Sequence, residues 1–288
     1  MRPAEAARAL ALAAALLAGV AFAAPALAPD ETVIRATVPA GAGLFARESR
    51  IDVTVFKPKG EGPFPIAVIS HGSPRSAAER RRGGRVRFEA QSRAFMAMGY
   101  AVVVPTRRGY GDSEGDWAEG YGPCSAPDYY AAGLESARDI LAATDAARVL
   151  PGLDGKRIVL VGQSAGAFGS VAAATMEVPG LVAVVNFAGG RGSQGAHDVC
   201  GEGYLVDTMA RYGKRSRVPQ LWVYSANDLY FDPPLARRMH AAFVGAGGRA
   251  ELVETPAFGT DGHMYFRNVS DWTPRVKAFL ESLPSAPR

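Results

Sequence analysis

The chain has 288 residues, of which 48% are hydrophobic and 21% charged, and its formal net charge is +4. This composition is ordinary for a globular protein with a buried core, and the length allows one large domain or two small ones. The charge excess is mild, with arginine far outnumbering lysine, which argues against a nucleic-acid-binding protein.

Residues 1–23 have the pattern of a secretory signal peptide. Arg2 and Arg8 give a basic start, an apolar run follows from Ala9 to Val20, and Ala-Phe-Ala at the end fits a small-residue cleavage site. The alternative is an uncleaved membrane anchor, but the run is short for a membrane span. We therefore expect an exported protein, periplasmic or secreted, whose residues 24–288 form a single domain without a membrane span.

The chain contains two cysteines, Cys124 and Cys200. In an oxidising compartment an even pair favours a disulfide, and two separate thiols are the alternative. The bond would join two long loops across about 76 residues and contribute roughly 3–4 kcal/mol in the chain-entropy treatment. Neither cysteine adjoins a histidine in the sequence, so we do not expect a cysteine nucleophile.

The first predicted elements are extended. Residues 32–38 and 51–57 alternate apolar and polar side chains, which predicts antiparallel edge strands with one wetter face. The apolar run 66–70 predicts a buried strand that ends in His71-Gly72-Ser73. An arginine-rich segment follows, and it is either a solvated loop and helix start or a cationic rim that attracts anionic substrates. Its arginines are Arg75, Arg80, Arg81, Arg82, Arg85 and Arg87.

The segment 88–98 carries apolar residues at helical spacing, and 100–104 predicts the next strand. Residues 105–127 then form a loop rich in glycine and aromatic residues, of a length that is usually functional. Within this loop, Arg108 and Tyr110 have either a contact with substrate or a structural role.

Helices and strands alternate to the end of the chain. Helices are predicted at 128–150, capped by Asp128, and at 204–212, 233–244 and 272–283, and strands at 158–161, 181–187, 221–225 and 250–254. This alternation predicts an α/β fold with a mostly parallel central sheet of about eight strands and helices on both faces.

A strand-to-helix turn with the pattern Gly-x-Ser-x-Gly organises the predicted sheet. Gly162 and Gly166 flank Ser164, which follows the apolar run 158–161 and precedes small residues that suit a closely packed helix. So sharp a turn strains the backbone at the serine and lifts its hydroxyl above the sheet, at the N-terminus of the helix. The alternative is a glycine-rich turn with an idle serine, so the partners of Ser164 decide between the two.

Two partners follow later strands, in the order Ser, Asp, His. Asp228 follows the strand 221–225 and His263 follows the strand 250–254. Because the carboxyl ends of parallel strands meet at one edge of a sheet, we expect them near Ser164. His263 then takes the serine proton and later protonates the leaving group, while Asp228 holds the imidazole in the required tautomer.

Other residues compete for these two roles. His240 lies inside a predicted helix and His197 in the loop after an earlier strand, so both fit worse than His263. Asp232 precedes a proline and is expected to cap a helix, and Asp261 is only two residues from His263.

A serine hydrolase also requires backbone N–H groups that hold a developing oxyanion. His71-Gly72-Ser73 ends the strand that we expect beside the strand of Ser164. We predict the amides of Ser73 and Ala165 as the donors, and losing one such donor typically raises the barrier by about 3–4 kcal/mol.

These residues together resemble the α/β-hydrolase superfamily, closest to its dienelactone-hydrolase-like and prolyl-oligopeptidase-like branches. The resemblance covers roughly residues 50–285 and rests on His71-Gly72-Ser73, the run Arg108 to Ser113, the run Gly162 to Gly166, the run Ser225 to Asp228, and Gly262-His263. It implies an α/β-hydrolase fold and a serine hydrolase that needs no metal or organic cofactor. Dienelactone hydrolase itself uses a cysteine where this chain has Ser164, so we do not expect that activity.

The leading hypothesis is an exported hydrolase of carboxylic esters, with small-molecule or polymer-derived esters as substrates. A peptidase or amidase of the prolyl-oligopeptidase type ranks second, because that family usually adds a large gating domain for which this chain has no room. The third hypothesis is a non-catalytic binding protein on a hydrolase fold, against which the complete set of Ser, Asp and His argues.

Overall fold

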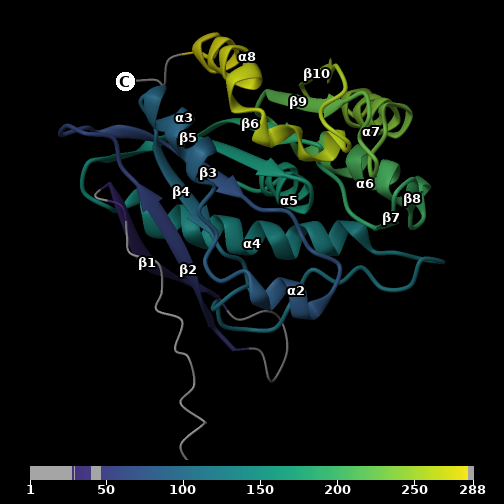
Figure 1. Ribbon diagram of the computed structural model, residues 1–288, viewed down its shortest axis with the longest axis horizontal. Helices are drawn as coiled ribbons and strands as arrows, with labels where there is room; N and C mark the ends of the chain where they lie inside the picture. Colours follow the sequence, from purple (N-terminus) through teal and green to yellow (C-terminus); the bar gives the residue numbers. More distant parts are fainter. Residues whose placement is uncertain (1–27, 29, 40–46, 285–288) are drawn as a thin grey trace, which may run out of the picture.

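The computed structural model describes residues 28, 30–39 and 47–284 (Figure 1). The predicted signal peptide, residues 1–23, lies outside the described residues. Within the described part of the chain, no helix combines the length and the apolar character that crossing a membrane requires.

The main sheet has eight strands in the order β1-β2-β4-β3-β5-β6-β9-β10. Their bounds are Glu31–Val38 for β1, Ser49–Phe56 for β2, Phe64–Ser70 for β3, Ala101–Pro105 for β4, Leu153–Gln163 for β5, Leu181–Phe187 for β6, Gln220–Ser225 for β9 and Ala250–Thr255 for β10. β2 pairs antiparallel with both β1 and β4, and all other pairs are parallel. The predicted α/β-hydrolase fold with a mostly parallel sheet is confirmed.

Helices cover both faces of this sheet (Figure 1). They are α2 (Ala77–Arg82), α3 (Glu89–Ala97), α4 (Tyr129–Arg148), α5 (Ala165–Ala173), α6 (Glu202–Arg215), α7 (Pro233–Gly245) and α8 (Val269–Glu281). Buried residues of α4, α5, α6 and α7 form one core with the sheet, and those of α3 and α8 form a second core on the opposite face. Asp128 caps α4 as predicted, because its carboxylate accepts the N–H of Ala131 at 2.9 Å.

The prediction of two edge strands holds for β1 and is wrong for β2. β2 lies between β1 and β4, and its residues Ile51–Phe56 are all buried. The arginine-rich segment covers Thr54 of β2, which accepts a hydrogen bond from Arg85 at 2.8 Å and donates one to the carbonyl of Val86 at 3.0 Å. Alternation in the sequence therefore marks two different faces here, but neither of them is solvated.

The long loop and the glycine-rich segment after β6 are joined covalently. Cys124 and Cys200 form a disulfide with a Cα–Cα distance of 5.0 Å, which confirms the predicted pair. The glycine-rich segment also contains a small antiparallel sheet of β7 (Ser193–Gly195) and β8 (Asp198–Val199). Both connections fix loops that lie above the carboxyl ends of the parallel strands.

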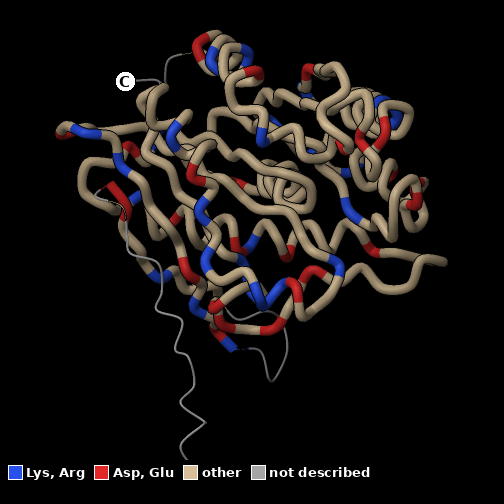
Figure 2. Tube along the Cα trace, viewed as in Figure 1, with Lys and Arg blue, Asp and Glu red and all other residues tan. Residues whose placement is uncertain are grey.

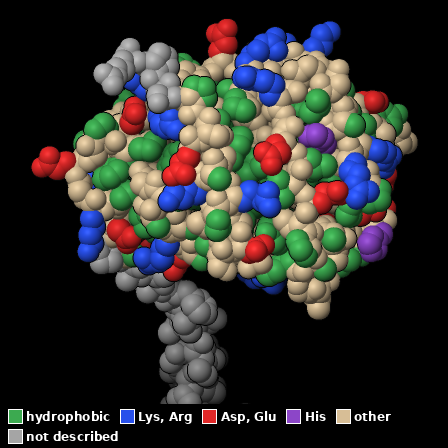
Figure 3. Space-filling view, turned by 90° about the horizontal axis from the view of Figure 1, so that it is seen from above, with side chains coloured by type: hydrophobic (Ala, Val, Ile, Leu, Met, Phe, Trp, Pro, Cys, Tyr) green, Lys and Arg blue, Asp and Glu red, His purple; other side chains and the backbone are tan. Residues whose placement is uncertain are grey.

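Charged residues gather around α2 and the loops beside it, whereas the strands in the middle of the sheet carry few of them (Figure 2). On the face seen in Figure 3, positive and negative side chains are interspersed among hydrophobic ones. This face therefore carries no broad field of a single sign.

Candidate active site

Ser164 occupies the turn between β5 and α5 in a strained backbone conformation. Its φ of 55° and ψ of −125° belong to a region that residues with a side chain rarely adopt. A Cβ on Gly162 would lie 2.4 Å from the amide nitrogen of Ala167, and one on Gly166 would lie 2.2 Å from the carbonyl oxygen of Ser70. Both positions therefore require glycine, and the predicted strain at the serine is confirmed.

The structure brings Asp228 and His263 together. Nδ1 of His263 lies 3.1 Å from each carboxylate oxygen of Asp228, which is buried. Oδ1 of Asp228 also accepts the backbone N–H groups of Tyr230 and Phe231, at 2.8 and 2.9 Å. Because a carboxylate binds the protonated ring nitrogen, Nδ1 carries the proton and Nε2 is left free to accept one.

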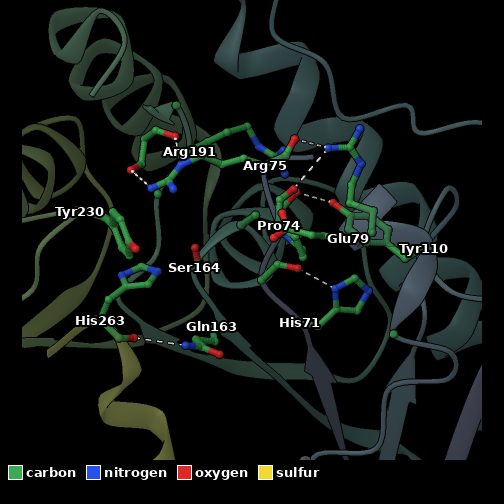
Figure 4. A pocket seen from close by; sticks show the side chains of 18 of the residues that line it. His71, Pro74, Arg75, Glu79, Tyr110, Gln163, Ser164, Arg191, Tyr230 and His263 are labelled. Atoms are coloured by element: carbon green, nitrogen blue, oxygen red, sulfur yellow. Dashed lines mark hydrogen bonds between the residues drawn. The ribbon is translucent and has the colours of Figure 1, made fainter. Parts of the chain in front are cut away.

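Ser164 and His263 line one cavity of about 700 Å³. Figure 4 shows the Ser164 hydroxyl on the side of the pocket where the imidazole lies. The imidazole is held from several directions: the ring centroids of Tyr230 and Phe231 lie 4.7 and 5.5 Å from its own, and Nε2 of Gln163 donates to the backbone carbonyl of His263 at 3.1 Å. Such packing keeps the imidazole in place in the lining of the cavity that also contains Ser164.

The competing residues lie elsewhere. His240 bonds a backbone carbonyl of β10 at 2.9 Å, and His197 is exposed in the turn between β7 and β8. Asp232 is the N-cap of α7, as predicted, and Asp261 accepts the backbone N–H of His263 at 2.9 Å rather than contacting its imidazole.

The two predicted oxyanion donors border the same cavity. Ala165 is the first residue of α5, where a backbone N–H has no partner within the helix. Ser73 follows Gly72, on which a Cβ would lie 3.3 Å from the Cβ of Ser164. The loop after β3 therefore passes directly beside Ser164, in keeping with the parallel pairing of β3 and β5. The role of these two amides stays a prediction.

A buried ionic cluster supports the loop that follows β3. Arg107 is 0% exposed; it bonds both carboxylate oxygens of Glu119, and its Nη1 donates to Oγ of Ser70 at 2.8 Å and to the carbonyl of His71 at 2.5 Å. Arg191, also buried, donates to Oε2 and to the backbone carbonyl of Glu119, at 2.8 and 3.1 Å. One buried carboxylate thus holds two buried guanidinium groups.

Glu119 and His71 are both buried, but Glu119 is kept charged whereas His71 is kept neutral. Burial alone raises the pKa of Glu119, but Arg107 and Arg191 outweigh it and hold the pKa of this carboxyl well below its usual range. For His71, burial and the positive charge of Arg107 lower the pKa to about 3. Nε2 of His71 accepts the backbone N–H of Arg107 at 3.1 Å, and its Nδ1 faces the carbonyl of Gly72 at 2.7 Å, so the ring is neutral with its proton on Nδ1.

Tyr110 connects the cluster to Ser73. Its hydroxyl oxygen lies 2.9 Å from Oε2 of Glu119 and 2.7 Å from Oγ of Ser73, and it accepts the indole N–H of Trp117 at 3.0 Å. An ionised carboxylate only accepts hydrogen bonds, so Tyr110 donates to Glu119 and Ser73 donates to Tyr110. Arg108, by contrast, bonds carboxylates of α4 and has a structural role.

Three residues of the site are not predicted from the sequence, namely Glu119, Arg191 and Tyr230. Glu119 and Arg191 stand 72 residues apart in two irregular segments, and no periodicity marks either of them. Tyr230 carries a weak signal, because it stands two residues after Asp228, whose carboxylate holds the imidazole of His263.

Comparison with known families gives one match. The X-Pro dipeptidyl-peptidase (S15) family matches residues 48–230, which is more than half of the chain and includes Ser164 and Asp228. No curated protein matches the chain.

Solved structures share the fold at low identity. An esterase from Pyrococcus furiosus is 15% identical, with a TM-score of 0.61, over 91% of this chain and 96% of its own. An α/β serine hydrolase without a lid from Xanthomonas campestris is 19% identical, with a TM-score of 0.57, over 92% of this chain and 100% of its own. A puromycin-hydrolysing peptidase from Mycobacterium tuberculosis is 19% identical, with a TM-score of 0.59, over 88% of this chain, which spans only 40% of the peptidase. At these identities the likeness shows the fold alone.

Proposed function

Given that this chain belongs to the X-Pro dipeptidyl-peptidase (S15) family and is a serine hydrolase of the α/β-hydrolase fold, we propose that it hydrolyses carboxylic esters outside the cytoplasm. Ser164, His263 and Asp228 are the proposed catalytic triad. One observation carries the proposal: a serine on a strained turn shares a cavity with an imidazole whose Nδ1 is held by a buried carboxylate.

The proposed reaction has two steps. Oγ of Ser164 attacks the ester carbonyl carbon while its proton passes to Nε2 of His263, and Asp228 stabilises the imidazolium. The amides of Ser73 and Ala165 stabilise the oxyanion, and its collapse expels the alcohol, which takes the proton from His263. Water then attacks the acyl carbon as His263 accepts its proton, and the acid leaves while Ser164 recovers a proton.

The charge of the cavity favours an ester over a peptide with a free amino terminus. A dipeptidyl-peptidase binds a protonated amino group, for which a carboxylate is the natural partner. Among the described residues that line this cavity, only Glu79 is acidic, and its Oε2 is bonded by the hydroxyl of Ser76 at 2.8 Å. Three arginines line the same cavity, namely Arg75, Arg80 and Arg191. An X-Pro peptidase is therefore the second candidate, and the family match favours it.

The solved structures give further support. This chain matches an esterase and a lidless serine hydrolase over 96% and 100% of their own lengths, but the puromycin-hydrolysing peptidase over 40%. The part that is shared is thus nearly the whole of the esterase and a minor part of the peptidase.

Export belongs to the proposal. It rests on the signal-peptide pattern of residues 1–23, and the Cys124–Cys200 disulfide supports it, because disulfides persist in oxidising compartments. Mass spectrometry of the protein from the periplasm or the medium should find a mature chain that begins at residue 24. A full-length chain retained in the cytoplasm would contradict export.

The direct test is hydrolysis of 4-nitrophenyl acetate and butyrate by the purified protein beside Ser164→Ala. We expect the substitution to lower kcat by at least about 10⁴-fold, because it removes the nucleophile. Equal turnover by the two proteins would refute the assignment of Ser164.

Two further measurements separate the alternatives. Hydrolysis of glycyl-prolyl-4-nitroanilide without hydrolysis of esters would place the peptidase first. A fluorophosphonate probe should label the folded protein but not Ser164→Ala, and a folded protein that resists the probe would favour a non-catalytic binding protein.

A further inference from the structure

Five of the six arginines of the segment 75–87 divide into two groups in the folded protein. Arg85 and Arg87 bond the buried carboxylate of Glu31 on β1, and Arg81 donates to two backbone carbonyls of the loop 105–127, both at 3.0 Å. These three arginines fasten the segment to its surroundings. Arg75 and Arg80, which we call the rim arginines, line the cavity that holds Ser164 instead.

Arg75 stands close to the proposed catalytic imidazole. Its guanidinium carbon lies 5.1 Å from the ring centroid of Tyr230, the residue that packs edge-on against His263. Its Nε and Nη2 donate to the carbonyl and the hydroxyl of Ser193, at 3.2 and 3.4 Å. Figure 4 shows Arg75, Tyr230 and His263 around the same opening as Ser164.

Arg80 is held in the lining by an aromatic ring and by two backbone carbonyls. Its guanidinium carbon lies 4.0 Å from the ring centroid of Trp117, and its Nη1 donates to the carbonyls of Pro74 and Arg75, at 3.2 and 2.7 Å. Carbonyls and an indole hold the guanidinium in place, but neither neutralises its charge.

The rim arginines therefore form no ion pair with a described residue. Among the described residues, no carboxylate oxygen lies within 4.0 Å of a nitrogen of either guanidinium. Glu79, the acidic residue of the lining, accepts a hydrogen bond from Oγ of Ser76 at the start of α2 and attracts Arg75 only across a longer distance. Two cations that lie over aromatic rings and border one cavity attract an anion that enters it.

We propose that the rim arginines bind a carboxylate of the substrate, so that the preferred substrates are esters that carry a carboxylate near the scissile bond. A planar guanidinium presents paired N–H donors that match the two oxygens of a carboxylate. The aromatic lining, formed by Trp117, Tyr121, Tyr230 and Phe231, accommodates the apolar body of such a molecule. This inference rests on the proposed ester hydrolysis and names the substrate class for that same site.

The test uses pairs of esters that have similar shapes but differ in charge. In the first pair, 4-acetoxybenzoate carries a carboxylate on the leaving alcohol, and its methyl ester is the neutral counterpart. In the second pair, mono-4-nitrophenyl glutarate carries a carboxylate on the acyl group, and 4-nitrophenyl pentanoate is the neutral counterpart. With each kcat/KM divided by the rate of alkaline hydrolysis, we expect the anionic member of at least one pair to be preferred about tenfold at low salt. The preference should shrink as ionic strength rises.

Variants assign the preference to the rim arginines. Arg75→Gln and Arg80→Gln should each lower the anionic-to-neutral ratio severalfold, and the double variant should abolish the preference. Arg82→Gln is the control, because Arg82 is exposed and lies in α2, the helix of Arg80, but outside the cavity lining; it should leave the ratio unchanged. Equal use of charged and neutral esters by the wild type, or a preference that survives the double variant, would overturn the proposal.

Binding without turnover separates this inference from the proposed function. Calorimetric titration of Ser164→Ala with 4-acetoxybenzoate and with its methyl ester should show tighter binding of the anion, and the difference should disappear when both rim arginines are replaced. Equal affinity for the two esters contradicts the substrate class, whereas failure of the wild type to hydrolyse even the neutral esters contradicts the proposed function.

Discussion

Arg107 supports the loop that follows β3 and Arg75 belongs to that loop, but only Arg107 bonds a carboxylate. Arg107 is 0% exposed and bonds Glu119, which also bonds the buried Arg191. Arg75 and Arg80 border an open cavity and bond carbonyls, a hydroxyl and aromatic rings. Arginine thus serves both in an interior cluster that contains its counter-charge and on the border of a cavity, where it forms no ion pair.

The difference follows from solvation. A charge removed from water is tolerated only with a partner and a full set of hydrogen bonds, so the interior cluster has to contain Glu119. A guanidinium beside an open cavity keeps part of its hydration and needs no partner until a ligand arrives. The carboxylate partner of Arg107 therefore indicates an architectural role, whereas Arg75 and Arg80 can pair with a ligand that enters the cavity.

The largest effect should come from removing the shared counter-charge. Glu119→Gln leaves two buried guanidinium groups unpaired, and we expect the free energy of unfolding to fall by about 3–5 kcal/mol in urea titrations. Arg75→Gln on the rim should change it by less than about 0.5 kcal/mol. Similar losses for the two variants would break the distinction between cluster and rim.

A smaller effect concerns the neutral histidine beside the cluster. The pKa of His71 is lowered from 6.5 to about 3, so between these values the unfolded chain takes up a proton that the folded chain does not. The free energy of unfolding therefore falls as the pH falls through this window. At about 1.36 kcal/mol per unit of pKa shift, His71 accounts for a loss of about 2 kcal/mol between pH 6.5 and 4.5. His71→Asn should remove this share, which urea titrations of both proteins at the two pH values will measure. Parallel losses in the two proteins would mean that His71 is not held neutral.

The sequence predicted best where the signal is local. The turn at Ser164 depends on a five-residue pattern between a buried strand and a helix of small residues, and these neighbours alone decide the backbone conformation. The pairing of Asp228 with His263 was also accessible, because both residues follow parallel strands whose ends must meet. The first inference needs only the local sequence, and the second needs only the sheet topology.

The interior cluster and the burial of β2 needed more than topology. Glu119 and Arg191 meet because the loop 105–127 folds back over the sheet, and no rule of periodicity describes that path. The alternation in β2 is the same whether its polar face meets water or, as here, Arg85. Composition alone does not distinguish the arginines of the segment 75–87, but Arg85 and Arg75 act differently because Arg85 bonds Glu31 and Arg75 does not.

The smallest effect tests whether the cluster influences the proposed reaction at all. Tyr110→Phe removes the hydroxyl between Glu119 and Ser73, and we expect a loss of about 1 kcal/mol in stability. If the loop after β3 holds the oxyanion donor, kcat for a neutral ester should also fall severalfold with little change in KM, because a displaced donor affects the transition state more than the bound substrate. Tyr204→Phe is the matched control, since Tyr204 is 48% exposed and bonds only a backbone carbonyl. A Tyr110→Phe protein that loses stability but keeps its kcat would confine the cluster to architecture and leave the rim as the part of the cavity that meets the substrate.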